Sequence, residues 1–428
     1  MDLHNRLKLA APAFSYVDGR LTAGGVDLAA IADAARGPAY VYALDAVLEG
    51  FNAFRTAFAG QPTRICYAMK ANDSVAILKV LADAGAGVDV VSGGELALAL
   101  AAGVPADRIV FSGVGKTDRE LVEALEAGVM QVNVETAYEL ERLSALAVER
   151  GKRAAVALRV NPDVDAGTLD VISTGRATDK FGIAYDEAEA IYAKAATLPG
   201  IDLAGVAMHI GSQIADVAHC AAACAKLRAL WERLAANGVR LRRFDIGGGL
   251  GIRYRDETPP SIQAYAETVK AAVAGLDCEV VLEPGRRIVG PTGALLAEVV
   301  SIKHAAGLRF VILNAAMNDL IRPALYKAWH EIVPLVDPGD APWTPAEIVG
   351  PVCESTDKFA AARPLPPLKP GDKVAFLCAG AYGAVMASEY NGRPRAPEAV
   401  VRNGQWSFSR PPRQYDDLIR EQSLPAWL

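Results

Sequence analysis

The sequence predicts an α/β protein, with a (β/α)8 barrel of the TIM type and a second, β-rich domain of the sandwich or barrel kind. Eight short β-rich runs follow one another from Ile65 onward, and an Ala-, Leu- and Glu-rich stretch of helical character separates each run from the next. Eight strand–helix units of this kind can close into a barrel of parallel strands. Past Gly285 the helical stretches become rare, which indicates the second domain. A doubly wound open sheet is the structural alternative.

The eight predicted strands read, in chain order, RICYAMK, GVDVVS, RIVFSG, MQVNVE, AVALRVN, GVAMHIGS, FDIGGG and VVLEPG, and a further run, AYVYAL, precedes them. The stretch DSVAILKVLADAGAG shows the character of the helices between them. Asp73 or Ser74 can cap its start, and Val75, Leu78 and Leu81 share one face.

The two ends of the chain indicate the β-rich domain. Four segments after Gly285 read as antiparallel strands, namely GALLAEVVSIK, RFVILNAA, DKVAFLCAG and PEAVVRNGQWSFSR. A hairpin-like segment of the same kind, DGRLTAGGVD, lies near the N-terminus. We therefore expect residues 38–285 to form the barrel, and residues 1–37 together with 286–428 to form the β-rich domain.

The composition excludes several classes of function. The chain has 428 residues, of which 52% are hydrophobic and 22% charged, as in folded globular proteins. A net charge of −6 and the lack of a long basic run give no general attraction to nucleic acid or to an anionic membrane. Since no signal-peptide core and no apolar run of about 18 residues occur, we expect a cytoplasmic protein whose cysteines are free thiols. Cys220 and Cys224, beside His219, are interpreted as core residues of a helix, and no metal site is expected.

Residues at the carboxyl ends of the strands face the active site in a barrel of this type. Each candidate alone has a simpler interpretation, since a lysine at a strand tip is usually solvated and three glycines often form only a tight turn. The set is harder to dismiss because all of its members converge on one mouth of the barrel. It consists of Lys70, Asp89, Arg159, His209, Ser212, Gly247, Gly248, Gly249, Glu283 and Arg286.

Together these residues describe a site for pyridoxal 5′-phosphate. A lysine such as Lys70 can form an imine with an aldehyde cofactor. Consecutive glycines let backbone N–H groups hold a phosphate, helped by a following helix N-terminus. A carboxylate such as Glu283, facing a pyridine nitrogen, keeps it protonated and makes the ring a strong electron sink. The imidazole of His209 can stack on a flat ring.

Further motifs accompany these residues along nearly the whole chain: YAMKAN, GVDVVSGGEL, IVFSGVGKT, LRVNPDVDAGT, ISTG, KFGI, HIGSQ, DIGGGLGI, EPGR, AAMNDLIRPALY, GPVCES, GAYGAVMASEYN and LPAWL. HIGSQ, EPGR and CES are specific in combination, whereas any one of them alone is weak. With these motifs the chain resembles the fold-type III pyridoxal-phosphate decarboxylases, and among them the diaminopimelate decarboxylase family.

The resemblance implies a role for each site residue. Lys70 would be the Schiff-base lysine, His209 would stack on the ring, and Glu283 would contact the pyridine nitrogen. Cys353 would reach the site from a second subunit as the proton donor, so that a homodimer shares its active sites. The cofactor would also be held by Asp89, Arg159, Ser212, Gly247, Gly248, Gly249, Pro284, Gly285, Arg286 and Tyr382. The substrate would be bound by Arg286, Arg322, Tyr326, Glu354 and Tyr382.

The reaction that the resemblance implies is decarboxylation of meso-2,6-diaminopimelate to L-lysine and CO2. The distal ammonium of this substrate suits Glu354, and its distal carboxylate suits the guanidinium groups of Arg286 and Arg322. A decarboxylase of ornithine or arginine, a racemase and a non-catalytic cofactor-binding homologue stay as alternatives. Glu283 argues against the racemase, which prefers a cation at the pyridine nitrogen. A non-catalytic homologue resembles the barrel alone, so it would leave the second domain, with Cys353, unexplained.

The sequence departs from the family pattern in one loop. After DAGT the family commonly has a histidine and a second small or polar residue, where this chain has Leu169, Asp170 and Val171. If the loop contacts substrate, affinity or loop closure differs from that of the family. The catalytic set itself is intact.

Overall fold

The computed structural model describes residues 3–164 and 180–428, and these divide into two compact units. The barrel unit consists of Leu48–Ile252 and Glu257–Ile288. The β-rich unit consists of Met1–Val47, Arg253–Asp256 and Val289–Leu428. Each unit is described by itself below.

The predicted (β/α)8 barrel is confirmed. Its eight strands are parallel, and β9 pairs with β8 as well as with β11, which closes the sheet on itself. A short additional strand, β10 (Ile183–Ala184), extends β9. The barrel strands are β5 (Thr63–Ala68), β6 (Gly87–Val90), β7 (Ile109–Phe111), β8 (Gln131–Val134), β9 (Ala154–Asn161), β11 (Ile201–Ala207), β12 (Arg243–Asp245) and β13 (Glu279–Leu282).

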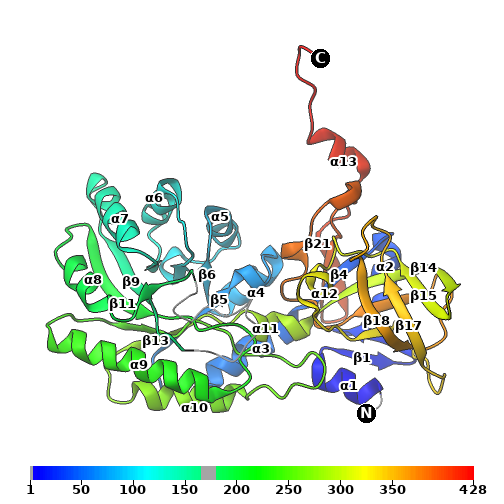
Figure 1. The fold of residues 1–428 in the computed structure, drawn as a ribbon, viewed down its shortest axis with the longest axis horizontal. Coiled ribbons are helices and arrows are strands. Elements are labelled where there is room, and N and C mark those ends of the chain that lie inside the picture. Colours follow the sequence, from blue (N-terminus) through cyan, green and yellow to red (C-terminus); the bar gives the residue numbers. More distant parts are fainter. Residues whose placement is uncertain (1–2, 165–179) are drawn as a thin grey trace. The chain divides into compact units, whose positions relative to one another are not determined.

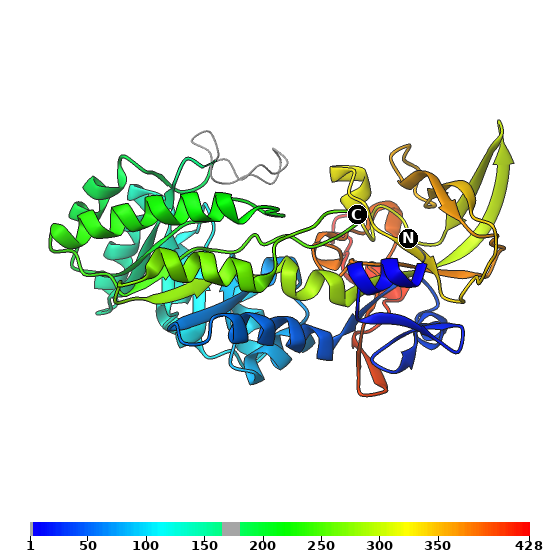
Figure 2. The ribbon, with the colours of Figure 1, turned by 90° about the horizontal axis from the view of Figure 1, so that it is seen from below.

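Helices surround these strands (Figure 1). They bury one apolar face each, as Leu78 and Leu81 show in α4, although Val75 of the same predicted face is exposed. Helices α9 and α10 lie side by side on the outside of the barrel (Figure 2). The helices are α3 (Leu44–Ala57), α4 (Val75–Asp83), α5 (Gly93–Ala101), α6 (Asp118–Ala127), α7 (Ala137–Glu149), α8 (Ala188–Ala195), α9 (Val217–Ala236) and α10 (Ile262–Val273), followed by the short α11 (Arg286–Val289).

Local sequence explains where these helices begin and end. Thr117 caps α6 in a capping box with Glu120, and Gly128 ends the helix in the left-handed conformation, at φ 73°. Ser92 caps α5 and Thr136 caps α7, each accepting a backbone N–H with its hydroxyl oxygen. Each cap follows a barrel strand by a few residues, so the loops that carry the site are short.

The β-rich unit holds a mixed sheet and a small three-stranded sheet. Strands β14 and β15, β14 and β19, and β20 and β21 pair antiparallel as the sequence suggested, but β15–β17 and β4–β20 pair parallel. The run AYVYAL forms β4 (Ala39–Ala43), which pairs with β14 and β20 and is no barrel strand. The other strands are β1 (Phe14–Val17), β2 (Arg20–Ala23), β3 (Val26–Asp27), β14 (Gly293–Ala305), β15 (Leu308–Leu313), β16 (Ile332–Pro334), β17 (Thr344–Val349), β18 (Lys358–Leu365), β19 (Lys373–Phe376), β20 (Glu398–Arg402) and β21 (Gln405–Arg410). Helices α1 (Leu3–Ala10), α2 (Leu28–Ala35), α12 (Arg322–Tyr326) and α13 (Tyr415–Arg420) accompany them.

Three expectations drawn from composition can be compared with the structure. All six cysteines are free thiols, and the Cys220 and Cys224 side chains lie buried on α9. Within residues 3–164 and 180–428, no group of histidine, cysteine and acidic side chains is arranged to hold a metal ion. Over the same residues, every helix is too short or too polar to cross a membrane.

Candidate active site

The carboxyl ends of the barrel strands surround a cavity of about 350 Å³. Four of the predicted site residues, which come from different strand ends, line it together: Lys70, Arg159, His209 and Glu283. The rest of the lining is formed by Val91, Ser112, Gly113, Val114, Asn133, Phe181, Ala207 and Met208. The structure thus brings the amine, the imidazole and the carboxyl group that the sequence singled out into one cavity.

The amine of Lys70 is held by a carboxylate. Lys70 lies in a 3-10 turn, Met69–Ala71, directly after β5, and its Nζ lies 2.6 Å from Asp89 Oδ2 at the neighbouring strand β6. The Asp89 side chain is fully buried, whereas that of Lys70 is 34% exposed. Asp89 Oδ1 has no hydrogen-bond partner in the described chain. The ion pair therefore orients Lys70 toward the cavity and leaves one buried acceptor next to it.

Arg159 is fixed by a partner that sequence reasoning missed. Its Nη1 donates to Glu135 Oε1 at 2.8 Å, and Glu135 Oε2 accepts the Gly182 N–H at 2.7 Å. The guanidinium also lies over the ring of Phe181, with 4.8 Å to the centroid. The KFGI segment and β8 together hold this cation at the edge of the cavity.

His209 is a neutral imidazole in this environment. Burial, reinforced by the positive charges of Lys70 and Arg159, holds its pKa well below the usual range. Its Nδ1 accepts the backbone N–H of Gly248 at 3.2 Å, which leaves the proton on Nε2. A flat, neutral ring therefore faces the cavity.

The three glycines after β12 pack backbone against backbone. A Cβ on Gly248 would overlap with the carbonyl oxygen of Glu283, and one on Gly249 with that of Gly211. Gly247 and Gly249 also adopt left-handed φ values of 65° and 104°. No side chain fits here, so the HIGS, GGG and EPG segments form one continuous backbone surface.

The EPGR segment lies next to the lysine turn. Ala68 N–H donates to the Pro284 carbonyl at 3.1 Å, and a Cβ on Gly285 would lie 2.9 Å from the Cβ of Ala71. The buried Arg286 donates from Nη2 to Ser212 Oγ at 2.9 Å. The end of the barrel that holds Lys70 thus also holds Ser212, Pro284, Gly285 and Arg286. This is expected for residues that follow the carboxyl ends of barrel strands.

Glu283 is buried at the end of β13. Burial is the first cause of the raised pKa of its carboxyl group, and the charges of Asp245 and Asp89 are the next. Its Oε1 accepts from the amide of Asn133 at 3.3 Å. Glu283 can therefore hold a proton or accept one at neutral pH, as a partner of a ring nitrogen must.

The other five predicted residues belong to the β-rich unit, and their contacts with the barrel residues stay a prediction. Arg322 begins α12 and is buried, donating from Nη1 to His330 Nε2 at 2.8 Å. Tyr326 ends the same helix, while Tyr382 adopts a left-handed φ of 56°. Cys353 and Glu354 lie in an exposed loop.

Two hydrogen bonds hold that loop. Val352 N–H donates to Asp357 Oδ2 at 2.8 Å, and Cys353 N–H donates to Asn391 Oδ1 at 3.0 Å. The CES segment therefore has a defined backbone although its side chains are exposed. The departing residues Leu169, Asp170 and Val171 lie outside the described residues.

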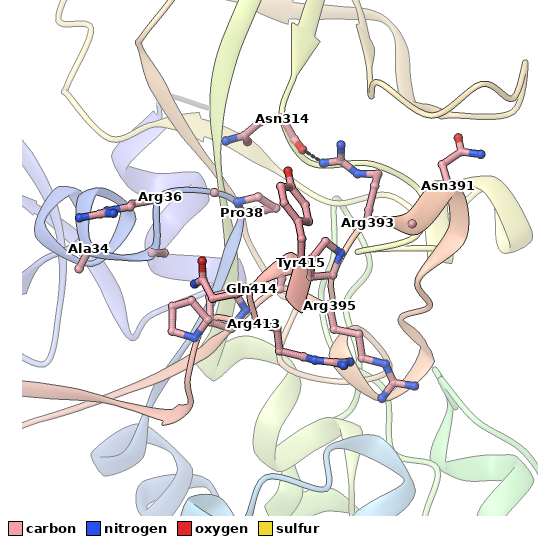
Figure 3. Close-up of a pocket in the computed structure, with 17 residues that line it drawn as sticks. Ala34, Arg36, Pro38, Asn314, Asn391, Arg393, Arg395, Arg413, Gln414 and Tyr415 are labelled. Carbon is pink, nitrogen blue, oxygen red and sulfur yellow. Dashed lines mark hydrogen bonds between the residues drawn. The ribbon is translucent and has the colours of Figure 1, made fainter. Parts of the chain in front are cut away.

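A larger cavity, of about 820 Å³, lies in the β-rich unit (Figure 3). It is lined by Arg36, Arg393, Arg395 and Arg413, together with Tyr415 and neighbouring residues. None of the predicted site residues lines it. Size alone would have pointed to this cavity, whereas the chemistry of the lining points to the smaller one in the barrel.

Sequence reasoning also missed a group of polar side chains inside the barrel. Gln131, Asn133 and Glu135 alternate with valines in and after β8, which is the pattern of a strand with polar residues toward the barrel interior. Asp245 ends β12, and Ile246 separates it from the glycines. The alternation in QVNVE was visible in the sequence, but nothing in it told which catalytic group these residues support.

The cavity fits pyridoxal phosphate in three respects. The side-chain-free backbone of the glycines lets a phosphate approach the loop closely. The orphaned Asp89 Oδ1 and the amine of Lys70 provide an acceptor and a nucleophile side by side. The neutral His209 ring and the raised pKa of Glu283 suit a flat pyridine. The residues present therefore match the donor set that this cofactor needs.

Comparison with known proteins agrees with this interpretation. Residues 44–290 match the family described as pyridoxal-dependent decarboxylase, pyridoxal binding domain, which confirms the predicted cofactor. The chain is 47% identical to diaminopimelate decarboxylase of Pseudomonas aeruginosa, over 96% of this chain and 99% of that protein. It is 44% identical to the enzyme of the same name from Zymomonas mobilis, over 97% of this chain and 99% of that protein.

Solved structures give the same picture. Diaminopimelate decarboxylase from M. jannaschii in co-complex with L-lysine matches with a TM-score of 0.93 and 33% identity, over 98% of this chain and 100% of that one. The Helicobacter pylori enzyme complexed with L-lysine matches with a TM-score of 0.89 and 38% identity, over 92% and 99%. Fold, site and sequence agree, and the chain belongs to the pyridoxal-dependent decarboxylases, within the diaminopimelate decarboxylase family.

Proposed function

We propose that this protein decarboxylates meso-2,6-diaminopimelate to L-lysine and CO2 with pyridoxal 5′-phosphate. The observation that carries the proposal is the cavity in which Lys70, His209 and Glu283 meet at the carboxyl ends of the barrel strands. The identity to diaminopimelate decarboxylases over nearly the full chain supports the choice of substrate.

The barrel residues hold the cofactor. When bound, pyridoxal phosphate supplies an aldehyde carbon that accepts amines and a protonated ring that takes up the electron pair released as CO2 leaves. Lys70 holds it through its amine, with Asp89 orienting the Nζ atom. His209 would cover one face of the ring, and the backbone of the glycine loop would bind the phosphate. Glu283 keeps the proton at the ring nitrogen.

Recognition of the distal end of the substrate is assigned to charged groups of both signs. Arg286 and Arg322 bind the distal carboxylate, and Glu354 binds the distal ammonium. Tyr326 and Tyr382 complete this part of the site. The buried Arg322, held by His330, offers a guanidinium whose orientation is fixed before substrate arrives, which reduces the entropy lost on binding.

We assign the final protonation to Cys353 of a second chain, so that a homodimer shares its sites. The exposure of Cys353 and the fixed backbone of its loop support this role, because an exposed thiol on an ordered loop can enter a partner's site. The net charge of −6 and the lack of a basic run support a cytoplasmic enzyme without nucleic-acid or membrane partners.

Product analysis tests the substrate. Purified protein with added cofactor is incubated separately with meso-diaminopimelate, ornithine and arginine, and the amines are separated. We expect lysine and an equal amount of CO2 from the first, and little product from the other two, whose distal groups lack the carboxylate that two arginines require. Preferred turnover of ornithine or arginine would replace the proposed substrate by the alternative one.

A further inference from the structure

A buried polar network lies beneath Glu283 in the barrel interior. The amide of Asn133 donates to Asp245 Oδ2 and Glu283 Oε1, each at 3.3 Å, and to Ser112 Oγ at 3.0 Å. Gln131 Nε2 donates to the same Asp245 oxygen at 3.3 Å. All five side chains are buried. Two carboxyl groups therefore face one buried amide.

This pair of carboxyl groups has no salt-bridge partner within residues 3–164 and 180–428. Lys70 and Arg159 act on Glu283 electrostatically, but each is paired with another acid, Asp89 and Glu135 respectively. Burying two unpaired carboxylates side by side is costly, because both desolvation and repulsion favour the neutral form of one of them. One proton shared between two acids removes most of this cost, as in other buried acid pairs.

The two acids differ in their hydrogen bonds. Asp245 accepts three N–H groups, from Gly247 at 2.9 Å, from Gln131 and from Asn133, whereas Glu283 accepts one from Asn133. Hydrogen bonds to the charged form favour ionisation, so Asp245, with more hydrogen bonds, carries the charge when nothing cationic faces Glu283. The pKa values agree, since burial raises that of Asp245 to about 7, and that of Glu283 is raised well above its usual range.

We propose that Asp245 is a positioning residue for Glu283, and that the two carboxyl groups share one proton and hence one negative charge, which moves to Glu283 when a cation faces it. The proposal rests on the proposed function only for the identity of that cation, a protonated ring nitrogen. The proton passes from one carboxyl group to the other, both of which face the amide of Asn133. The O–H bond of Glu283 breaks, an O–H bond forms on Asp245, and the net charge of the pair stays the same.

This arrangement lets the charge of the site follow its ligand. Because the pair carries one charge in both states, a cation at Glu283 meets a full carboxylate without any proton being taken from water. The charge of Asp245 is then not added to that of Glu283, so the barrel never buries two charges there. Other titratable groups that act on the pair are Asp89, Lys70, Arg159, and the buried, neutral Cys66 and Tyr265.

Infrared titration of the cofactor-free protein tests the shared proton. The protonated carboxyl band is followed against pH in the wild type, Asp245→Asn, Glu283→Gln and the double variant. We expect removal of either acid to lower the titration midpoint of the other by about 1 pH unit or more, the usual size for a close like charge. Midpoints that do not depend on the partner acid would overturn the proposal. If one variant fails to fold, the other tests the same coupling from the opposite side.

A matched control and an isotope label sharpen this test. Asp319→Asn removes another buried acid, whose pKa burial raises to about 6, in the β-rich unit, and should leave both midpoints unchanged. In protein labelled with 13C at aspartate carboxyls, the band that persists above pH 7 should lie at the unlabelled, glutamate position. Addition of pyridoxal phosphate should move it to the labelled, aspartate position. A band that stays on glutamate refutes the transfer, and neither result depends on which substrate is decarboxylated.

Discussion

Arg159 Nη1 lies 2.8 Å from Glu135 Oε1, and this buried pair joins the ends of β9 and β8 at the cavity. Removing one partner of a buried ion pair leaves an uncompensated charge. Glu135→Gln should therefore lower the free energy of unfolding by about 3 kcal/mol. It should also weaken cofactor binding, because Arg159 loses its orientation. Urea denaturation of the cofactor-free protein and a pyridoxal phosphate titration measure the two effects.

The control for this variant is a pair of the same chemistry on the surface. Arg119 and Glu123 interact on the exposed face of α6 at 2.7 Å, so Glu123→Gln should cost about 1 kcal/mol or less. Equal losses in the two variants would mean that the Arg159–Glu135 pair contributes no more than a solvated one.

The stability of the cofactor-free protein should fall as the pH rises from about 4 to about 7 through the contribution of Asp245. Burial raises the pKa of this carboxyl group to about 7, so between the unfolded and folded pKa values the folded state binds more protons than the unfolded state. The free energy of unfolding therefore decreases with pH in this window and levels off above it. Asp245→Asn should flatten the curve relative to the wild type. Denaturation at pH 5 and pH 8 measures the free energy of unfolding of both proteins. The same change between the two pH values in the wild type and in Asp245→Asn would contradict the raised pKa of Asp245.

Glu283→Gln should leave the cofactor bound and slow the reaction. Glutamine keeps the size of the side chain but cannot hold a positive charge at the ring nitrogen. Loss of one preorganised charge at the reacting group predicts a fall in kcat of about 10²-fold or more. Single-turnover kinetics with meso-diaminopimelate measures the rate of the reaction, and the absorbance of the bound cofactor measures its occupancy. Near-normal turnover would remove the argument that the ring must stay protonated.

Arg322→Lys should impair substrate recognition more than folding. The guanidinium of Arg322 donates to His330 and lies over the ring of Tyr254, at 4.7 Å from the centroid. Lysine keeps the positive charge but lacks the planar, two-pronged donor that this guanidinium presents. Loss of a charged hydrogen bond of about 1.5–3 kcal/mol predicts a fall in kcat/KM of about 10- to 150-fold. Glu354→Ala should act likewise through the distal ammonium. Wild-type efficiency in both variants would make the substrate assignment wrong, even with the fold right.

Mixing two inactive variants tests the shared site. Lys70→Ala and Cys353→Ala homodimers should each be nearly inactive, but a mixed dimer has one site with both defects and one with neither. Subunit exchange in an equimolar mixture should restore about a quarter of wild-type activity, because half the dimers are mixed and each has one intact site of two. If mass spectrometry shows exchange and no activity returns, Cys353 serves its own chain or has no role.

The barrel could be predicted from the sequence because its signal repeats. Eight β-rich runs alternate with helices, so single errors at strand ends do not change the topology. The run AYVYAL, which lies inside the expected barrel range 38–285, is no barrel strand. It is as apolar as a barrel strand and precedes a helix, but it pairs with β14 and β20, and such long-range pairing leaves no mark in a short window of sequence.

The site could be predicted as a set of residue types but not as a network. Lys70, His209 and Glu283 stand at strand ends, where barrel geometry places functional groups. The supporting residues Glu135 and Asp245 act on Arg159 and Glu283, which lie in or directly after the neighbouring strands β9 and β13. Each pair is brought together by strand pairing, although its members lie 24 and 38 positions apart in the sequence. Only the three-dimensional structure shows that these acids have catalytic partners.

The central claim is that Lys70 is the amine that holds the cofactor at the mouth of the barrel. Borohydride reduction of the loaded protein, followed by peptide mapping by mass spectrometry, tests it directly. The account predicts the reduced cofactor on the peptide that contains Lys70 and none in Lys70→Ala. Lys116, whose buried Nζ lies 2.7 Å from Glu139, is the internal comparison and should stay unlabelled. A label on Lys116 or on any other lysine in place of Lys70 would contradict the account.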